Sequence, residues 1–134
     1  MTSKQLDKAF QKMLHSDIQG ELYFSIEDYN PDSERGWIVF MDKDFEELYR
    51  CSPKMHQILE WYLSSPKKAY SKALNSATGY ERALAVLDQQ TGMRCIDDWN
   101  DDEDTLVQTF YELRKKYQSL PRTERDSVLR CVFS

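Results

Sequence analysis

The sequence predicts an α+β fold in which helices dominate and pack around one small antiparallel sheet. Three observations support this prediction. Apolar residues recur at helical spacing along most of the chain, strand-like alternation is confined to residues 21–41, and Gly, Pro or Ser residues separate the segments. The chain has 134 residues and no linker-like or repetitive stretch, so we expect a single domain over residues 1–134.

The N-terminal segment has the features of an amphipathic helix. Its apolar residues recur every three or four positions and would fall on one helical face. They are Leu6, Ala9, Phe10, Met13 and Leu14. Thr2 and Gln5 have the spacing of a capping box, and Gly20 would end the helix or open a turn. We therefore expect this helix to begin close to Thr2.

A β-hairpin is predicted over residues 21–41. In "ELYFSIEDY" apolar and polar residues alternate, as they do in a strand with one buried face. "NPDSERG" supplies loop residues, with Gly36 able to adopt a positive φ. "WIVFM" is short and rich in aromatic and β-branched residues, so we expect a strand buried on both faces. Because an isolated hairpin is marginally stable, "MRCI" at residues 93–96 is a candidate third strand.

Helical periodicity returns after the hairpin. Residues 42–51 are expected to form a short helix, because their apolar residues are helically spaced. These residues are Phe45, Leu48 and Tyr49. Two Ser-Pro pairs, at residues 52–53 and 65–66, are typical of helix starts, and each precedes an apolar stripe.

Capping pairs and a proline mark the starts of three more helices. In chain order they are Thr78 with Glu81, Asn100 with Glu103, and Pro121. Gly92 would end the first of these helices.

Negative charge is concentrated in two stretches. The net charge is −5, but residues 17–47 carry −8 and residues 97–104 carry −6, so the remainder is mildly positive. Nucleic-acid binding depends on Lys and Arg, so this balance favours a basic partner over nucleic acid. With no apolar run of membrane-spanning length, no secretory signal pattern and three widely spaced cysteines, we expect a cytoplasmic protein without membrane contact.

The acidic run "DDWNDDED" at residues 97–104 has three interpretations. An EF-hand loop needs Gly at its sixth position and Glu at its twelfth, and registers starting at Asp98 or Asn100 lack both. A helix start explains the acids from Asp101 to Asp104, which would complement the positive end of the helix dipole. Asp97 and Asp98 lie before the expected cap and add only repulsion. The surplus charge indicates a surface for a cationic partner.

Catalytic and cofactor-binding motifs are absent from the sequence. The four glycines form no phosphate-binding loop, and there is no Gly-x-Ser-x-Gly elbow. His56 and Glu60 are one helical turn apart, but two ligands make a poor metal site. We therefore predict no catalytic residue, no cofactor and no metal, and we do not expect an enzyme. An enzyme of another type would need a pocket containing acids with perturbed pKa values.

Positive charges form only modest groups. One group surrounds an expected helix start, and another lies on the expected last helix. They are Lys67, Lys68 and Lys72 in the first group, and Arg122, Arg125 and Arg130 in the second. Beside a net negative charge, such groups favour a solvated face or contact with an acidic partner over nucleic-acid binding.

The leading hypothesis is a small acidic protein that binds and inhibits a basic partner, such as a nuclease or another nucleic-acid-binding enzyme. Its carboxylates would take the places of phosphates, and aromatic residues would supply buried anchors. Immunity proteins against nuclease toxins and phage inhibitors of host defence enzymes are similar in kind only. The predicted contact residues are Asp97, Asp98, Asp101 and Asp102, followed by Asp28, Asp32 and Glu34 of the hairpin loop.

A second hypothesis comes from the C-terminal third of the chain. The apolar faces of the two helices expected after residue 104 could pack against a copy of the same chain or a larger assembly. The protein would then be a structural or adaptor subunit, oligomeric on its own. Its association would be insensitive to salt, whereas binding through acidic residues would weaken as salt rises.

Overall fold

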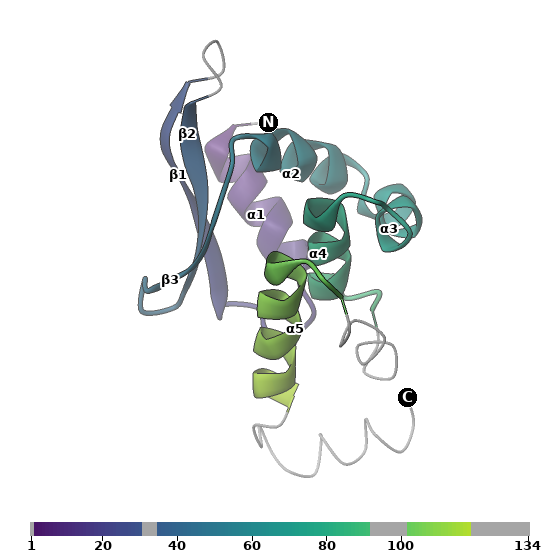
Figure 1. Ribbon diagram of the computed structural model, residues 1–134. Helices are drawn as coiled ribbons and strands as arrows, with labels where there is room; N and C mark the ends of the chain where they lie inside the picture. Colours follow the sequence, from purple (N-terminus) through teal and green to yellow (C-terminus); the bar gives the residue numbers. More distant parts are fainter. Residues whose placement is uncertain (1, 31–34, 92–101, 119–134) are drawn as a thin grey trace, which may run out of the picture.

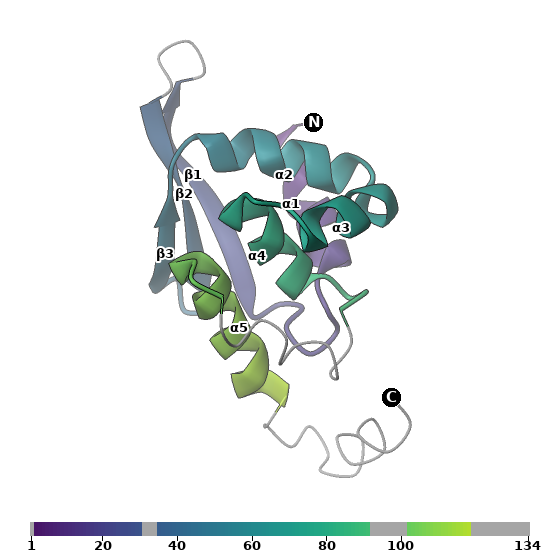
Figure 2. The same cartoon turned by 45° about the vertical axis from the view of Figure 1, so that its right-hand side comes forward.

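The computed structural model describes residues 2–30, 35–91 and 102–118. These residues form five helices and a three-stranded antiparallel sheet, which confirms the predicted α+β class. In chain order the elements are α1 (Ser3–Met13), β1 (Leu22–Asn30), β2 (Arg35–Asp42), β3 (Glu47–Cys51), α2 (Lys54–Ser64), α3 (Pro66–Leu74), α4 (Gly79–Leu87) and α5 (Thr105–Gln118). All five helices lie on one side of the sheet (Figures 1 and 2). None of the described helices combines the length and the apolar character needed to cross a bilayer.

Helix α1 begins with the predicted capping box. The backbone N–H of Thr2 donates to Gln5 Oε1 at 2.9 Å, and the N–H of Gln5 donates to Thr2 Oγ1 at 3.2 Å. Two of the orphan donors at the helix start are thereby satisfied. The predicted apolar face is buried at Leu6, Phe10 and Met13.

The predicted hairpin is confirmed as β1 and β2, with β2 in the centre of the order β1-β2-β3. Gly36 has the expected positive φ, 109°. In β1 the alternation is as predicted, with Leu22 and Phe24 facing the helices. The prediction that β2 is buried on both faces is confirmed from Ile38 to Phe40. It is wrong at Trp37, whose side chain is 44% exposed.

The predicted helix over residues 42–51 is wrong, because the chain turns at residues 43–46 and returns as β3. Asp42 Oδ1 accepts hydrogen bonds from the N–H groups of Asp44 and Glu46, at 2.8 and 3.1 Å. Phe45 adopts a positive φ of 62° and is 77% exposed, so it does not belong to an apolar helical face. Pairing with β2 satisfies backbone groups that an unpaired edge would leave open. The third strand therefore lies here, and residues 93–96 are outside the described residues.

Four phenylalanines connect the sheet to the helices. Phe10 of α1 meets Phe24 of β1 edge-to-face, with ring centroids 5.1 Å apart. Phe40 of β2 meets Phe110 of α5 in the same geometry at 5.0 Å. Edge-to-face pairs add about 0.5–1.5 kcal/mol beyond area burial. This cluster holds α1 and α5 against the inner face of the sheet.

The helices predicted from the two Ser-Pro pairs are confirmed as α2 and α3. Helix α4 lies deepest, since five consecutive residues from Ala83 to Leu87 are fully buried. A helix that is apolar all round is expected in a core. The predicted end at Gly92 and the last helix from Pro121 lie outside the described residues.

The C-terminal end of α4 is closed by polar groups inside the core. Arg114 of α5 is 0% exposed, and its Nη1 donates to the carbonyls of Val86 and Thr91 at 2.8 and 2.7 Å. Thr91 Oγ1 donates to the carbonyl of Ala85 at 2.6 Å, and Tyr62 Oη donates to Asp88 Oδ2 at 2.5 Å. Carbonyls in the last turn of a helix have no partner within the helix, and the bonds to Val86 and Ala85 supply one to each of these two residues.

Burial lowers the pKa of Arg114 to about 10, and the nearby Asp17 counteracts this shift. The guanidinium therefore stays positively charged at neutral pH. Burial raises the pKa of Asp88, and the hydrogen bond from Tyr62 opposes that shift. Among the described residues Nη1 alone makes hydrogen bonds, and Nε and Nη2 of Arg114 are buried without a hydrogen-bond partner, so the core holds a charged group that is only partly satisfied.

Replacing Arg114 by methionine should destabilise the fold. The change preserves an unbranched side chain but leaves two buried carbonyls without a donor and removes the positive charge near Asp17 and Asp88. We expect the free energy of unfolding to fall by about 3 kcal/mol. Urea denaturation measures it, with Lys116→Met on the exposed side of α5 as the control. Equal stability of R114M and K116M would contradict a stabilising role for the buried cation.

Candidate interaction surface

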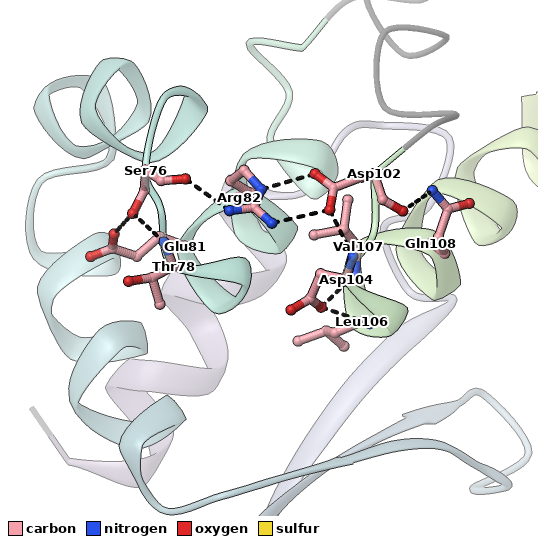
Figure 3. Close-up of polar contacts among 9 residues, drawn as sticks. All are labelled: Ser76, Thr78, Glu81, Arg82, Asp102, Asp104, Leu106, Val107 and Gln108. Carbon is pink, nitrogen blue, oxygen red and sulfur yellow. Dashed lines mark hydrogen bonds and ion pairs between the residues drawn. The ribbon is translucent and has the colours of Figure 1, made fainter.

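The structure describes only the end of the predicted acidic run. Asp97, Asp98 and Asp101 lie outside the described residues, so their contact with a partner stays a prediction. Asp102 lies directly before α5, where it faces α4 (Figure 3). Glu103 is exposed.

Asp102 forms a two-pronged salt bridge with Arg82 of α4. Arg82 Nε donates to Asp102 Oδ2 at 2.9 Å, and Nη2 donates to Oδ1 at 3.0 Å. The hydrogen bonds from Arg82 hold the pKa of Asp102 below its ordinary value. Only 12% of the Asp102 side chain is exposed. Asp102 therefore connects the chain before α5 to α4. Its predicted contact with a partner protein is not tested by these bonds and stays a prediction.

Asp104 provides the cap of α5. Its Oδ1 accepts hydrogen bonds from the N–H groups of Leu106 and Val107, at 2.9 and 3.3 Å. Helix α5 accordingly begins at Thr105, and its first turn contains no acidic residue. The prediction of a helix starting after Asn100 with acids in its first turn is therefore wrong, because Asp104 offers a cap closer to the apolar stripe. Asn100 itself lies outside the described residues.

The start of α4 is built against the same segment. A Cβ at Gly79 would collide with the carboxylate of Asp104, so a side chain there would displace the group that caps α5. The capping box predicted for Thr78 and Glu81 does not form, since the Thr78 side chain makes no cap hydrogen bond. Ser76 Oγ instead accepts from the Thr78 N–H at 3.0 Å and donates to Glu81 (Figure 3). The starts of α4 and α5 thus form one polar junction.

A second candidate site is the outward sheet face, the side of the sheet opposite the helices. Strand alternation and register place eight side chains there. They are Tyr23, Ser25, Glu27, Trp37, Val39, Met41, Glu47 and Arg50. Trp37 and Tyr23 are the large apolar side chains most exposed on this face. None of the described helices covers it (Figures 1 and 2).

Arg50 organises the charges of the outward sheet face. Its guanidinium lies 5.5 Å from the centroid of the Trp37 ring, in cation–π geometry. Its Nη2 is 2.6 Å from Glu47 Oε1, and its Nη1 is 3.4 Å from Glu27 Oε2. Hydrogen bonding to Glu47 raises the pKa of Arg50. Two carboxylates and one guanidinium leave this group with one net negative charge beside an exposed indole.

The turn between β2 and β3 adds acids at the end of this face. Asp44 and Glu46 are exposed there. Asp32 and Glu34 of the hairpin loop lie outside the described residues, and so does the side chain of Asp28, whose backbone belongs to β1. Their contact role stays a prediction.

Arg50 is the residue of the outward sheet face that sequence reasoning missed. Tyr23 and Trp37 lie within the first negative stretch, so alternation along the strands could place them on one face. Arg50 was assigned to an expected helix, and only the pairing of β3 with β2 brings it beside Trp37.

The described residues contain no group of three His, Cys, Asp or Glu that could hold a metal ion. His56 Nε2 lies 3.8 Å from Glu60 Oε1 on α2, as the spacing predicted. Burial raises the pKa of the Cys51 thiol to about 12, so this cysteine is a poor nucleophile at neutral pH.

No protein-family model, no curated protein and no solved structure matches this chain. The geometry described above is therefore the sole basis for a functional proposal.

Replacing Asp102 by asparagine should lower the free energy of unfolding by about 2 kcal/mol at neutral pH, because it breaks a partly buried two-pronged salt bridge. Since the folded pKa of Asp102 is lowered, the contribution is present above the unfolded pKa, about 3.9. It is lost as pH falls through the folded pKa. Urea denaturation across pH should show the difference between wild type and D102N shrinking at acidic pH.

The matched control for this experiment is Glu103→Gln, which removes one exposed acid of the same run. We expect E103Q to change the free energy of unfolding by less than about 0.5 kcal/mol. A D102N difference that stays constant down to strongly acidic pH would contradict the role of the ionised carboxylate.

Proposed function

We propose that this protein binds a basic protein without catalysing a reaction, and that it does so through the outward sheet face. The observation that supports this proposal is the exposure of Trp37 and Tyr23 on one uncovered face, beside the carboxylates of Glu27 and Glu47. Exposed aromatics beside fixed charges are typical of binding surfaces, because aromatic and Arg side chains supply most hot spots.

The ion pairs of Arg50 favour binding because they restrict the side chains before a partner arrives. Trp37 contacts Arg50, which is itself fixed by Glu27 and Glu47. Ordering a long side chain during association costs about 0.5–1.5 kcal/mol, and prior ordering removes part of this cost. A partner would meet a rigid apolar anchor with a charged border.

The charge of the chain favours a basic partner. The face itself carries net negative charge, exposed acids lie in the turn after β2, and the whole chain is at −5. Such a surface increases the rate of encounter with cationic proteins. The most specific form of the proposal is an inhibitor that covers the cationic site of a nuclease or other nucleic-acid-binding enzyme, with its carboxylates in place of phosphates.

The alternative of a structural subunit is less favoured, because α5 uses its apolar face within the chain. Leu106, Val107 and Phe110 are fully buried, and Leu113 is nearly so. An assembly through the C-terminal helices would then depend on residues after Gln118, which lie outside the described residues.

Replacing Trp37 by alanine should weaken partner binding about tenfold or more, because it removes the central aromatic anchor. The test is affinity capture from a lysate of the source organism at low and high salt, with bound proteins identified by mass spectrometry. We expect a stoichiometric basic protein whose recovery falls at high salt and falls further with W37A.

Trp61→Ala is the matched control, because Trp61 is an equally large exposed residue, 39% accessible, on α2 away from the sheet. W61A should capture the same partner as wild type. A partner retained at high salt and by W37A would contradict the proposal. Recovery of only the protein itself would favour the structural subunit.

A further inference from the structure

A cavity of about 360 Å³ lies between α2 and α3. Six residues line it, and they include an indole, two hydroxyls and two ammonium groups. They are Trp61, Ser64, Ser65, Lys68, Ala69 and Lys72. Helix α3 lies at the far side of the helical layer from the sheet (Figures 1 and 2), so this cavity is separate from the outward sheet face.

The positive charge of Lys68 is not offset within the fold, whereas Lys72 lies in the last turn of α3, where the helix dipole favours a cation. Among the described residues, neither Lys68 nor Lys72 has a carboxylate within salt-bridge distance. Lys67 and Lys68 follow Pro66 in the first turn of α3, and that turn contains no acid. A cation at a helix start is unfavourable by about 0.3–1 kcal/mol, because the helix dipole is positive there. An anion bound beside Lys68 would reverse this unfavourable interaction.

Two serine hydroxyls, those of Ser64 and Ser65, line the same cavity. Ser65 precedes α3 as its cap residue, yet its side chain makes no cap hydrogen bond. Ser64 Oγ already donates to the carbonyl of Glu60 at 2.5 Å, so Ser65 is the hydroxyl that can donate to a bound anion. The two ammonium groups lie one helical turn apart on α3 and could contact one multivalent anion together.

We infer that the cavity between α2 and α3 binds a small anion that carries an aromatic ring, of the class of nucleoside monophosphates. Lys68 and Lys72 contact the phosphate, and the exposed indole of Trp61 stacks on the ring. A phosphate carries up to two negative charges and three acceptor oxygens, which suits two ammonium groups better than a single carboxylate does.

The size of the cavity favours a ring in addition to the anionic group. The cavity is open to solvent, since five of its six lining residues are exposed, and its volume lies within the range of about 300–1,000 Å³ that is usual for small-molecule sites. Base stacking on an aromatic side chain contributes about 1–3 kcal/mol and tolerates different bases. We therefore expect affinity for several nucleoside monophosphates rather than for one.

The test is a titration of the full chain with AMP, followed in the ¹H–¹⁵N spectrum through the indole N–H of Trp61, which is assigned with Trp61→Phe. We expect a saturable shift of this resonance at millimolar AMP or below, and weaker binding as salt rises.

The double variant K68Q/K72Q should weaken AMP binding about tenfold or more. K67Q is the matched control, since Lys67 belongs to the same helix turn but does not line the cavity, and it should change binding less than about twofold.

Adenosine and inorganic phosphate, titrated separately, test the two halves of the ligand. Each should bind more weakly than AMP, because AMP joins stacking to charge. No saturable shift at Trp61 with AMP, or AMP binding that is unchanged in K68Q/K72Q, would overturn the inference. Saturable binding of a poly-glutamate peptide at Trp61 in place of AMP would also overturn it and identify an acidic peptide site.

Discussion

The fold depends on a short helix whose C-terminal half is buried on every side, so that its last carbonyls must find hydrogen-bond donors inside the protein. Helix α4 has nine residues, and its last five are inaccessible to solvent. Its final carbonyls cannot turn to water, so Arg114 and Thr91 donate to them from inside the core. An unpaired buried carbonyl costs about 1–3 kcal/mol, so the position of Arg114, and with it that of α5, is tightly restricted. Burial of one helix thus determines where the next one lies.

The opposite end of α4 imposes the same constraint by different residues. Arg82 holds Asp102, and the cap residue Asp104 lies against Gly79, where a Cβ would displace the Asp104 carboxylate. The start of α5 is therefore fixed by the start of α4, just as its interior is fixed by the end of α4 through Arg114. With two such attachments, Phe110 meets Phe40, and the helical layer is joined to the sheet.

Local signals predicted the elements whose ends are determined by neighbouring residues. The capping box of Thr2 and Gln5 and the alternation in β1 depend on contacts a few positions apart, and the structure confirms them. The Ser-Pro pairs mark the starts of α2 and α3 correctly, although no side chain caps either helix. β3 was missed because Leu48 and Tyr49 fit helical spacing in so short a segment, and the decisive pairing is with β2. The acids at Asp102 and Asp104 were misread as dipole compensation, because Arg82 is twenty residues from Asp102. The outward sheet face could be predicted through Tyr23 and Trp37, whereas Arg50 could not.

The carboxylates of this protein have two different roles, and counting acids along the sequence does not distinguish them. Some make contacts within the fold, and others lie on an exposed surface. The carboxylates of Asp102 and Asp104 make hydrogen bonds within the fold, since their oxygens accept from Arg82 and from backbone N–H groups. Glu27 and Glu47 lie on a face without helices and share a single guanidinium, so part of their charge remains available to solvent or to a partner. Lys68 is the reverse case, because its charge in the first turn of α3 opposes the dipole of its own helix. Function is expected where residues lower the stability of the fold and no structural contact compensates for them. By that criterion the sheet face and the cavity beside α3 are the places to search, and the junction between α4 and α5 belongs to the scaffold that holds them apart.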